Sequence, residues 1–238
     1  KVFHKVARQN LRNLNTNSDG TWQMKFWYIY GAGGLGDETM DILCHMIADR
    51  SLTDLKPAFL IDGPAGDPIN EHPVVSLEDA VPGSFVTIAV GEPAIRTMLR
   101  EKCVDAGLEL ASAISPKAFV SEFAVLGRGC IVAPFCSIQA RARVDENVAI
   151  NTAAIVGHDV VVERDTGLSS LTNLGGGSRV GAGSYLGMGA LVKESLTIGH
   201  STIVGMGSVV YNDVPEEVVC VGNPARVSRR NTDQRVFK

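Results

Sequence analysis

A valine, leucine or isoleucine stands at every sixth position of this chain from residue 114 to residue 210. The series has no gap: Ile114, Val120, Leu126, Val132, Ile138, Val144, Ile150, Val156, Val162, Leu168, Leu174, Val180, Leu186, Val192, Ile198, Val204 and Val210. A small or β-branched residue follows four positions after most of them, and a glycine often follows directly. A period of six matches neither the helical turn of about 3.6 residues nor the alternation of an open sheet. It is typical of a solenoid in which each hexapeptide forms one short strand and one corner.

Three such hexapeptides would complete one triangular coil. The aliphatic residues would point into the prism, the small residues would fit the corners, and successive coils would pair at roughly 4.8 Å per layer. The segment from Ile114 to Val214 is therefore predicted to be a parallel β-helix of between five and six coils.

The abrupt start of this repeat divides the 238 residues into two parts. A net charge of −4 argues against a general binder of nucleic acid or of membrane surfaces. No apolar run approaches the roughly 20 residues of a membrane span, and the first residues lack the apolar core of a signal peptide. We therefore expect a cytoplasmic protein with no nucleic-acid partner and no membrane span.

The five cysteines suggest neither a disulfide framework nor a zinc site, because their number is odd and no C-x-x-C pair occurs. Cys130 and Cys136 occupy the same slot of successive hexapeptides, which predicts a packing role at the corners. No metal is expected.

The first part of the chain has a different pattern. Residues 1–24 are polar and are predicted to be an extension, to which we assign no function. Strand signals follow at 26–30, at a segment that ends at residue 62, and at 85–90, with helical patterns after the first and third of these. This order predicts a Rossmann-like α/β domain at 25–110, a βαβαβ unit of the mononucleotide-binding type.

A glycine loop follows the first predicted strand, with Gly31, Gly33 and Gly36 in the spacing G-x-G-x-x-G. Such glycines let the backbone approach a phosphate at the N-terminus of the next helix. A nicotinamide dinucleotide would also require an acid about 20 residues later and a second half of the fold. Asp62 comes too late for that role, so NAD is disfavoured, and a tight turn without a ligand is the other interpretation.

The repeat of an aliphatic residue, a glycine and a small residue resembles the signature of the hexapeptide acyltransferases, whose β-helix is left-handed. The tail Gly222–Arg226 resembles the segment that closes this helix in many members. The short Rossmann-like unit fused directly to this repeat resembles the bacterial sugar acyltransferases that include sialic acid O-acetyltransferases and N-acetyltransferases of nucleotide-linked 4-amino sugars. The resemblance implies a nucleotide-sugar domain at 25–110, a left-handed β-helix acyltransferase domain for acetyl-CoA at 111–215, a closing segment at 216–238, and a homotrimer with sites at the subunit boundaries.

Acetyl transfer needs a general base, and the chain has five histidines. His4, His45 and His72 lie outside the predicted β-helix, which leaves His158 and His200. The two are 42 residues apart, so they should lie on different faces of one prism.

The segment Asn151–Asp159 closely resembles the active-site segment of the family. The resemblance implies that His158 is the base, that Asp159 tunes it and that Asn151 contacts the substrate. Because adjacent residues in a strand point to opposite faces, we expect Asp159 to act through the backbone or across a subunit boundary.

The remaining site residues also come from the resemblance. It places Gly33, Gly34 and Leu35 in the loop that holds the nucleotide sugar, with Asp62 and Gly91 at strand ends on the same edge. It places the acetyl-CoA site at three positions of the β-helix, namely Gly167, Met188 and Met206. Relatives often have histidine at the positions of Leu35 and Gly167, so this chain departs from the family pattern there.

The main hypothesis is an acetyl-CoA-dependent acetyltransferase for a nucleotide-linked amino sugar, with sialic acid O-acetylation as its alternative. Nothing in the sequence separates an amine from a hydroxyl acceptor. A γ-type carbonic anhydrase would require three histidines around zinc, and only two lie on the predicted β-helix. A non-catalytic solenoid would need an exposed apolar or aromatic stripe, and none is expected outside Tyr185 and Tyr211.

Overall fold

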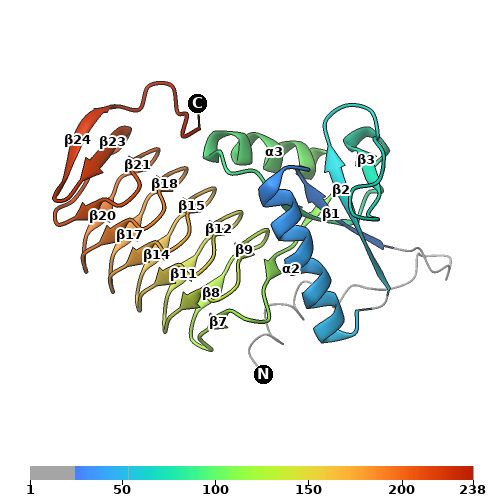
Figure 1. Cartoon of the computed structure of the whole chain (residues 1–238), viewed down its shortest axis with the longest axis horizontal. Helices are drawn as coiled ribbons and strands as arrows, with labels where there is room; N and C mark the ends of the chain where they lie inside the picture. Colours follow the sequence, from blue (N-terminus) through green and yellow to red (C-terminus); the bar gives the residue numbers. More distant parts are fainter. Residues whose placement is uncertain (1–24, 53, 238) are drawn as a thin grey trace.

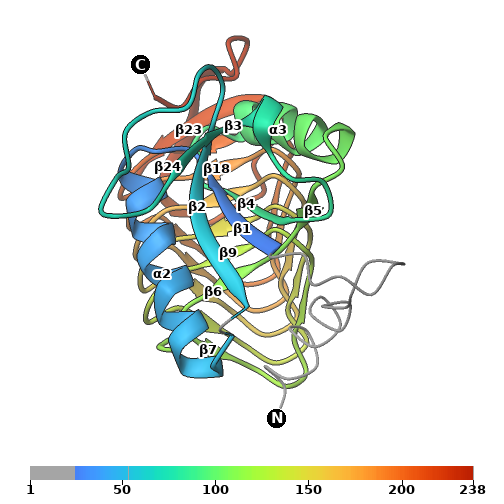
Figure 2. The ribbon, with the colours of Figure 1, turned by 90° about the vertical axis from the view of Figure 1, so that its right-hand side faces the viewer.

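The computed structural model describes residues 25–52 and 54–237 (Figure 1). The predicted extension at 1–24, with His4, lies outside the described residues. A small parallel sheet with two helices stands against one side of a long stack of coils (Figure 1 and Figure 2).

The sheet contains five parallel strands in the order β3-β2-β1-β4-β5. Its elements follow the chain as β1 (Lys25–Tyr30), α2 (Gly34–Arg50), β2 (Leu55–Ile61), β3 (Val74–Ser76), a short 3₁₀ helix (Leu77–Asp79), β4 (Phe85–Ile88), α3 (Pro93–Asp105) and β5 (Glu109–Leu110). The helices lie on opposite sides of the sheet (Figure 2). Alternation along β1 explains this, because Trp27 and Ile29 share a core with α2, whereas Tyr28 and Tyr30 share one with α3.

The segment between β2 and β4 differs from a regular crossover. No α-helix lies there among the described residues, and the chain forms the edge strand β3 and one turn of 3₁₀ helix instead. A strand of three residues is too short to show alternation in the sequence, so β3 was not predicted.

The predicted parallel β-helix is confirmed. Its strands have two residues each and form three stacks whose partners are eighteen residues apart, as in Gly167 beside Tyr185. The β6 stack contains β6 (Ala113–Ile114), β9 (Ile131–Val132), β12 (Ala149–Ile150), β15 (Gly167–Leu168), β18 (Tyr185–Leu186) and β21 (Ile203–Val204). The β7 stack contains β7 (Phe119–Val120), β10 (Ser137–Ile138), β13 (Ile155–Val156), β16 (Asn173–Leu174), β19 (Leu191–Val192) and β22 (Val209–Val210). The β8 stack contains β8 (Val125–Leu126), β11 (Arg143–Val144), β14 (Val161–Val162), β17 (Arg179–Val180) and β20 (Thr197–Ile198).

These three stacks form the faces of a triangular prism, with turns at its corners. The first corner joins the β6 stack to the β7 stack, the second joins the β7 stack to the β8 stack, and the third joins the β8 stack back to the β6 stack. Every member of the six-residue series is buried except Val120, which is half-buried in the first coil. The period of six therefore arises because each face contributes one aliphatic side chain to the interior of each coil.

The two repeat cysteines are packing residues. Cys130 and Cys136 are buried, and their thiols donate hydrogen bonds to the backbone carbonyls of Asp145 and Asn151, each at 3.1 Å. Burial raises the pKa of each thiol to about 11.

A hairpin closes the far end of the stack. β23 (Val218–Gly222) pairs in parallel with β21 and antiparallel with β24 (Ala225–Arg230). The hairpin therefore covers a strand edge that could otherwise pair with another chain.

A buried arginine joins the α/β part to the β-helix. The Arg96 guanidinium on α3 donates to the carbonyl oxygens of Ile88 at 2.6 Å and of Asn147 at 2.7 Å, and to Asn147 Oδ1 at 2.9 Å. Asn147 lies at the third corner and donates to Asp165 Oδ1 at 2.7 Å. Burial lowers the pKa of Arg96 to about 10. Because these polar groups satisfy one another inside the molecule, they fix how the sheet sits on the prism.

Candidate active site

The glycine loop leaves open space at the N-terminus of α2. Gly31 has φ +113°, and a β-carbon at Gly36 would overlap the carbonyl oxygen of Gly31, so the turn requires both glycines. Gly33 and Gly34 differ, because a β-carbon on either would have no atom within 4 Å. Their backbone is thus free for a ligand at a helix end that favours negative charge.

Asp62 lies at the end of β2 on the same edge. It accepts hydrogen bonds from the Tyr30 hydroxyl at 2.8 Å and from Lys102 Nζ at 3.1 Å. The Tyr30 hydrogen bond is the main cause of a lowered pKa of Asp62, and Lys102 adds to it. The carboxylate is therefore ionised and held facing the carboxyl edge of the sheet, where open α/β sheets bind ligands.

Four of the predicted residues line one cavity of about 150 Å³ between the sheet edge and the β6 stack, namely Leu35, Gly91, Asn151 and Gly167. Asn151 Oδ1 is buried there without a hydrogen-bond partner. A buried acceptor without a partner costs free energy unless a ligand supplies the donor.

Sequence reasoning missed the other five residues that line this cavity: Glu38, Ala149, Leu168, Tyr185 and Phe237. Tyr185 also explains the departure at Gly167, because a β-carbon at Gly167 would lie 2.9 Å from Tyr185 Cδ2. The tyrosine ring thus fills the space that a side chain at position 167 would take. The eighteen-residue coil period was the available signal, since it places the two residues side by side.

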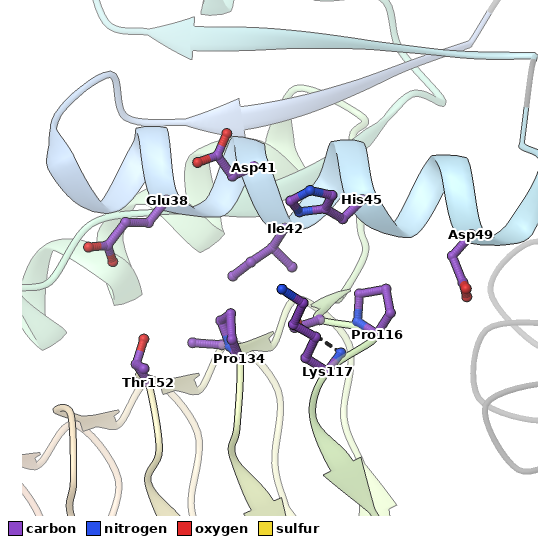
Figure 3. Close-up of a pocket in the computed structure, with 11 residues that line it drawn as sticks. Glu38, Asp41, Ile42, His45, Asp49, Pro116, Lys117, Pro134 and Thr152 are labelled. Carbon is purple, nitrogen blue, oxygen red and sulfur yellow. Dashed lines mark hydrogen bonds between the residues drawn. The ribbon is translucent and has the colours of Figure 1, made fainter.

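A larger groove of about 440 Å³ runs between α2 and the first corner (Figure 3). Glu38, Asp41, His45 and Asp49 line it from α2, and Lys117 is among the residues that line it from the β-helix. Glu38 also lines the smaller cavity, so the two spaces adjoin at the N-terminal end of α2.

His158 and Asp159 form a direct pair at the second corner. His158 Nδ1 lies 2.8 Å from Asp159 Oδ2, and Arg141 binds the same carboxylate through Nε at 2.7 Å and Nη2 at 2.8 Å. The pKa of Asp159 is held well below its ordinary value, first by the Arg141 hydrogen bond and then by His158. An ionised carboxylate accepts only, so in the neutral imidazole Nδ1 carries the proton and Nε2 carries the lone pair.

The expectation that Asp159 would not contact His158 directly is wrong. Alternation applies within a strand, but Asp159 stands in a turn with φ +59°. That conformation turns its side chain toward the imidazole beside it. The imidazole is 61% exposed in the single chain rather than buried.

Gly176 lies one coil below the imidazole. A β-carbon there would come within 2.5 Å of His158 Cε1 and 3.0 Å of Cδ2, and closer still to Nε2. The absence of a side chain at position 176 therefore creates the space in which the ring lies.

The candidate residues of the β-helix other than Asn151 and Gly167 lie at the corners of the prism, away from the small cavity. His158 lies at the second corner, which is opposite the face formed by the β6 stack and hence opposite the small cavity. Met188 and Met206 lie exposed at the first corner and not beside Gly167. His200 lies at the third corner, with Nε2 3.2 Å from Glu216 Oε2, so it is separated from His158 as predicted.

Within 25–52 and 54–237, no group of three histidine, cysteine or acidic side chains is placed to hold a metal ion. Neither α2 nor α3, the two α-helices of that part of the chain, has the length and apolar character for crossing a membrane.

Comparison with known proteins identifies the family, although no family model matches. The chain is 28% identical over 217 residues to GDP-perosamine N-acetyltransferase from Escherichia coli O157:H7, which covers 87% of this chain and 98% of the relative. It is 31% identical to PerB from Caulobacter crescentus, solved with CoA and GDP-perosamine, with a TM-score of 0.77 and the same coverage of 87% and 98%. It is 30% identical to the acetyltransferase domain of PglB from Neisseria gonorrhoeae, solved with acetyl coenzyme A, with a TM-score of 0.78 and coverage of 87% and 100%.

These matches confirm the predicted fold class, an α/β unit followed by a left-handed β-helix. The matches also cover nearly the whole length of each relative, so both the α/β part and the β-helix have counterparts in these proteins. The chain belongs to the bacterial hexapeptide-repeat N-acetyltransferases of nucleotide-linked amino sugars.

Proposed function

We propose that this protein transfers the acetyl group of acetyl-CoA to the amine of a nucleotide-linked amino sugar, with His158 as the general base. The hydrogen-bonded pair of His158 and Asp159 carries the proposal, because it leaves a basic Nε2 in a chain whose solved relative binds CoA and GDP-perosamine. Amine transfer is favoured over O-acetylation of sialic acid, since the matched relative from Escherichia coli is named an N-acetyltransferase.

His158 would act on the acceptor amine through Nε2. As the amine nitrogen attacks the thioester carbonyl carbon, Nε2 takes the amine proton, and Asp159 stabilises the imidazolium that forms. The carbon–sulfur bond breaks, and the imidazolium returns the proton to the departing CoA thiolate. Arg141 holds the carboxylate in place by two hydrogen bonds and so keeps the tautomer fixed.

The acceptor would bind along the carboxyl edge of the small sheet. Gly33 and Gly34 offer open backbone at a helix N-terminus for its phosphates, and Asp62 offers an ionised carboxylate to a hydroxyl or base N–H. Asn151 Oδ1 offers an acceptor without a partner in the cavity that Leu35, Gly91 and Gly167 also line.

The groove beside α2 supports an amine acceptor. It has three carboxylates, from Glu38, Asp41 and Asp49, against one lysine, Lys117. Such a surface repels phosphate but attracts the ammonium group of an amino sugar. We infer that the sugar enters this end of the site while the phosphates remain at the glycine loop.

A homotrimer is proposed from the exposed apolar surface of the prism. The expectation of no exposed apolar stripe outside Tyr185 and Tyr211 is wrong. Large apolar side chains lie exposed on the β7 stack and at the first corner: Phe119, Phe135, Leu171, Met188, Leu191 and Met206. Extensive exposed apolar surface marks an interaction site in soluble proteins. The β6 stack cannot form the subunit interface, because the outward side chains of Ala113, Ile131 and Ala149 are already buried beneath the α/β part.

A three-fold ring would complete the active site. The β7 stack lies between the first and second corners, so packing this face around a three-fold axis brings the first corner of one copy to the second corner of the next. Asn151 begins the first corner, which also carries Met188 and Met206 as proposed acetyl-CoA contacts, and the neighbour would supply His158. Residues 25–110 would then hold the acceptor, 111–215 would bind acetyl-CoA between copies, and 216–238 would close the helix.

The test is activity recovered in mixed trimers. His158→Ala and Asn151→Ala are purified separately, denatured together in equal amounts and refolded. If the site is shared, about one site in four combines an intact His158 with an intact Asn151, so activity rises to about a quarter of the parent value. A mixture no more active than the two variants alone would contradict a shared site.

A histidine control accompanies this test. His158→Ala should lower kcat by about 10²–10⁴-fold, whereas His200→Ala should stay within a few-fold of the parent. The reverse result would contradict the assignment of the base. A cytoplasmic location stays a prediction, and it is supported by the five cysteines, all of which are unpaired.

A further inference from the structure

The segment Gln234–Phe237, here called the C-terminal strap, returns from the far end of the β-helix to the start of α3 (Figure 1). The carboxylate of Glu92 holds it there. The backbone N–H of Val236 donates to Glu92 Oε1 at 2.9 Å and to Oε2 at 3.1 Å, and the N–H of Phe237 donates to Oε2 at 3.2 Å. Glu92 is buried, so these are charge-assisted hydrogen bonds away from solvent.

The strap places the Phe237 ring inside the acceptor edge of the sheet. The ring stands edge-on to Tyr185 with centroids 5.5 Å apart, and it rests against Gly91, where an added β-carbon would lie 3.0 Å from Phe237 Cε2. Gly91 follows β4, next to the central strand β1 and its glycine loop. Phe237 thus occupies the carboxyl end of the sheet, where a ligand of this fold is expected.

The size of the cavity indicates that the ring is in the way. With Phe237 in its wall, the space at the sheet edge measures about 150 Å³, whereas sites for small molecules and cofactors usually measure roughly 300–1,000 Å³. A nucleotide sugar belongs to the larger of these ligands. While the ring stays in place, most of a nucleotide sugar would have to lie in the adjoining groove of about 440 Å³. Phe237 is also 55% exposed, and its neighbours Tyr185 and Gly91 are only half-buried, so the ring is loosely packed.

We propose that the C-terminal strap competes with the acceptor: Phe237 occupies part of the acceptor site and leaves it when a nucleotide sugar binds. This inference rests on the proposed function of the cavity as the acceptor site. The apparent dissociation constant of the acceptor then equals its intrinsic value divided by the fraction of molecules in which the strap is open. The proposed acetyl-CoA contacts Met188 and Met206 lie at the first corner, which does not carry the strap, so acetyl-CoA affinity serves as the reference.

The alternative is a fixed aromatic wall on which the ligand packs, and it predicts the opposite sign. Removing the ring would then weaken acceptor binding instead of strengthening it. Glu92→Gln provides an independent test, because it weakens the hydrogen bonds that hold the strap and leaves the Phe237 ring unchanged.

The experiment measures acceptor binding by calorimetry without acetyl-CoA, so that no turnover occurs. The probes are GDP-perosamine and the UDP- and dTDP-linked 4-amino sugars, and the parent is compared with Phe237→Ala, Glu92→Gln and the control Val227→Ala, an exposed apolar position on β24. We expect Phe237→Ala and Glu92→Gln to bind the probe at least about threefold more tightly, and about tenfold if the strap is closed nine-tenths of the time. Val227→Ala and the affinity for acetyl-CoA should not change.

Equal or weaker binding by Phe237→Ala, with the parent binding normally, would overturn the competition and leave the proposed function intact. Failure of every protein to bind any of the probes, while acetyl-CoA still binds, would overturn the proposed acceptor and the strap together. Binding of the probe by the two variants but not by the parent would support competition between the strap and the acceptor.

Hydrogen exchange supplies a second measurement that does not depend on affinity. The amides of Val236 and Phe237 should lose protection when the nucleotide sugar is added and keep it when acetyl-CoA is added. In Glu92→Gln they should exchange faster even without ligand. Greater protection on addition of the nucleotide sugar would overturn the proposal.

Discussion

Replacing Gly176 with alanine is predicted to impair catalysis without unfolding the protein. The three heavy atoms nearest an added β-carbon at this position all belong to the His158 ring. The ring is exposed and can swing away, so the substitution should cost the fold little. The geometry of the base should change instead.

The magnitude follows from the distances. Carbon atoms in contact prefer a separation of about 3.5–4.0 Å, whereas the new carbon would lie 2.5 Å from His158 Cε1. The ring must therefore retreat by about 1 Å or rotate, which also strains its hydrogen bond of 2.8 Å to Asp159. A misplacement of about 1 Å can cost about 10²-fold in rate. We expect kcat to fall by about that factor.

The assay compares CoA release with unfolding in urea. The control is Gly66→Ala, where an added β-carbon would meet only Val74 Cγ1, at 3.9 Å, and the backbone is not left-handed. Both alanine variants should unfold within about 1 kcal/mol of the parent, and only Gly176→Ala should lose activity. Acetyl-CoA binding by Gly176→Ala, measured without acceptor, should be largely retained.

A double variant separates displacement of the base from any other effect. If Gly176→Ala acts through His158, then adding it to His158→Ala should change kcat no further, since residues that act as a unit are not additive. A further loss of about 10²-fold in the double variant, or full activity in Gly176→Ala, would refute the reasoning.

Three further predictions follow from the packing. Gly33→Leu should raise KM for the nucleotide sugar and leave acetyl-CoA affinity and the urea midpoint unchanged, because an added β-carbon at Gly33 would have no atom within 4 Å. Equal loss of both affinities would contradict the assignment of the loop. Arg96→Met should lower the free energy of unfolding by about 3 kcal/mol, because it leaves the backbone carbonyl oxygen and the side-chain amide oxygen of Asn147 unpaired. A change below about 1 kcal/mol, measured by urea titration, would contradict a buried network. Cys130 and Cys136 should resist alkylation in the folded protein at pH 9, because burial raises the pKa of each thiol to about 11; rapid labelling of the folded protein would contradict this. The unfolded chain releases these protons at lower pH, so the free energy of unfolding should decline as pH rises from about 9 toward 11.

The β-helix could be predicted because each coil repeats the same physical requirement. One aliphatic residue per face must enter the prism, so the pattern recurs with a fixed period and can be read without a structure. The same regularity gave the correct separation of His158 from His200. The site residues at 33–35, 62 and 91 could be placed on one edge because parallel strands present their ends together.

Errors and omissions arose where the chain leaves these regular patterns. Alternation along a strand does not hold at a corner, and this is why the contact between His158 and Asp159 was missed. Tyr185 could have been found from the eighteen-residue coil period, which pairs it with Gly167. Phe237 gave no signal, because its position depends on a hydrogen bond from a non-repeating tail to a distant Glu92.

The topology of the prism also explains why one copy of the chain should not suffice for catalysis. The α/β part buries the face of the β6 stack, and the cavity proposed for the acceptor lies along that face. The turn that carries His158 belongs to the corner joining the other two faces. A triangular cross-section places that corner as far as possible from the buried face, so bending the chain within one copy cannot bring the base to the acceptor without breaking the stack. The same constraint favours the proposed three-fold ring, since each β7 stack has the proposed acceptor edge at one side and the proposed base His158 at the other.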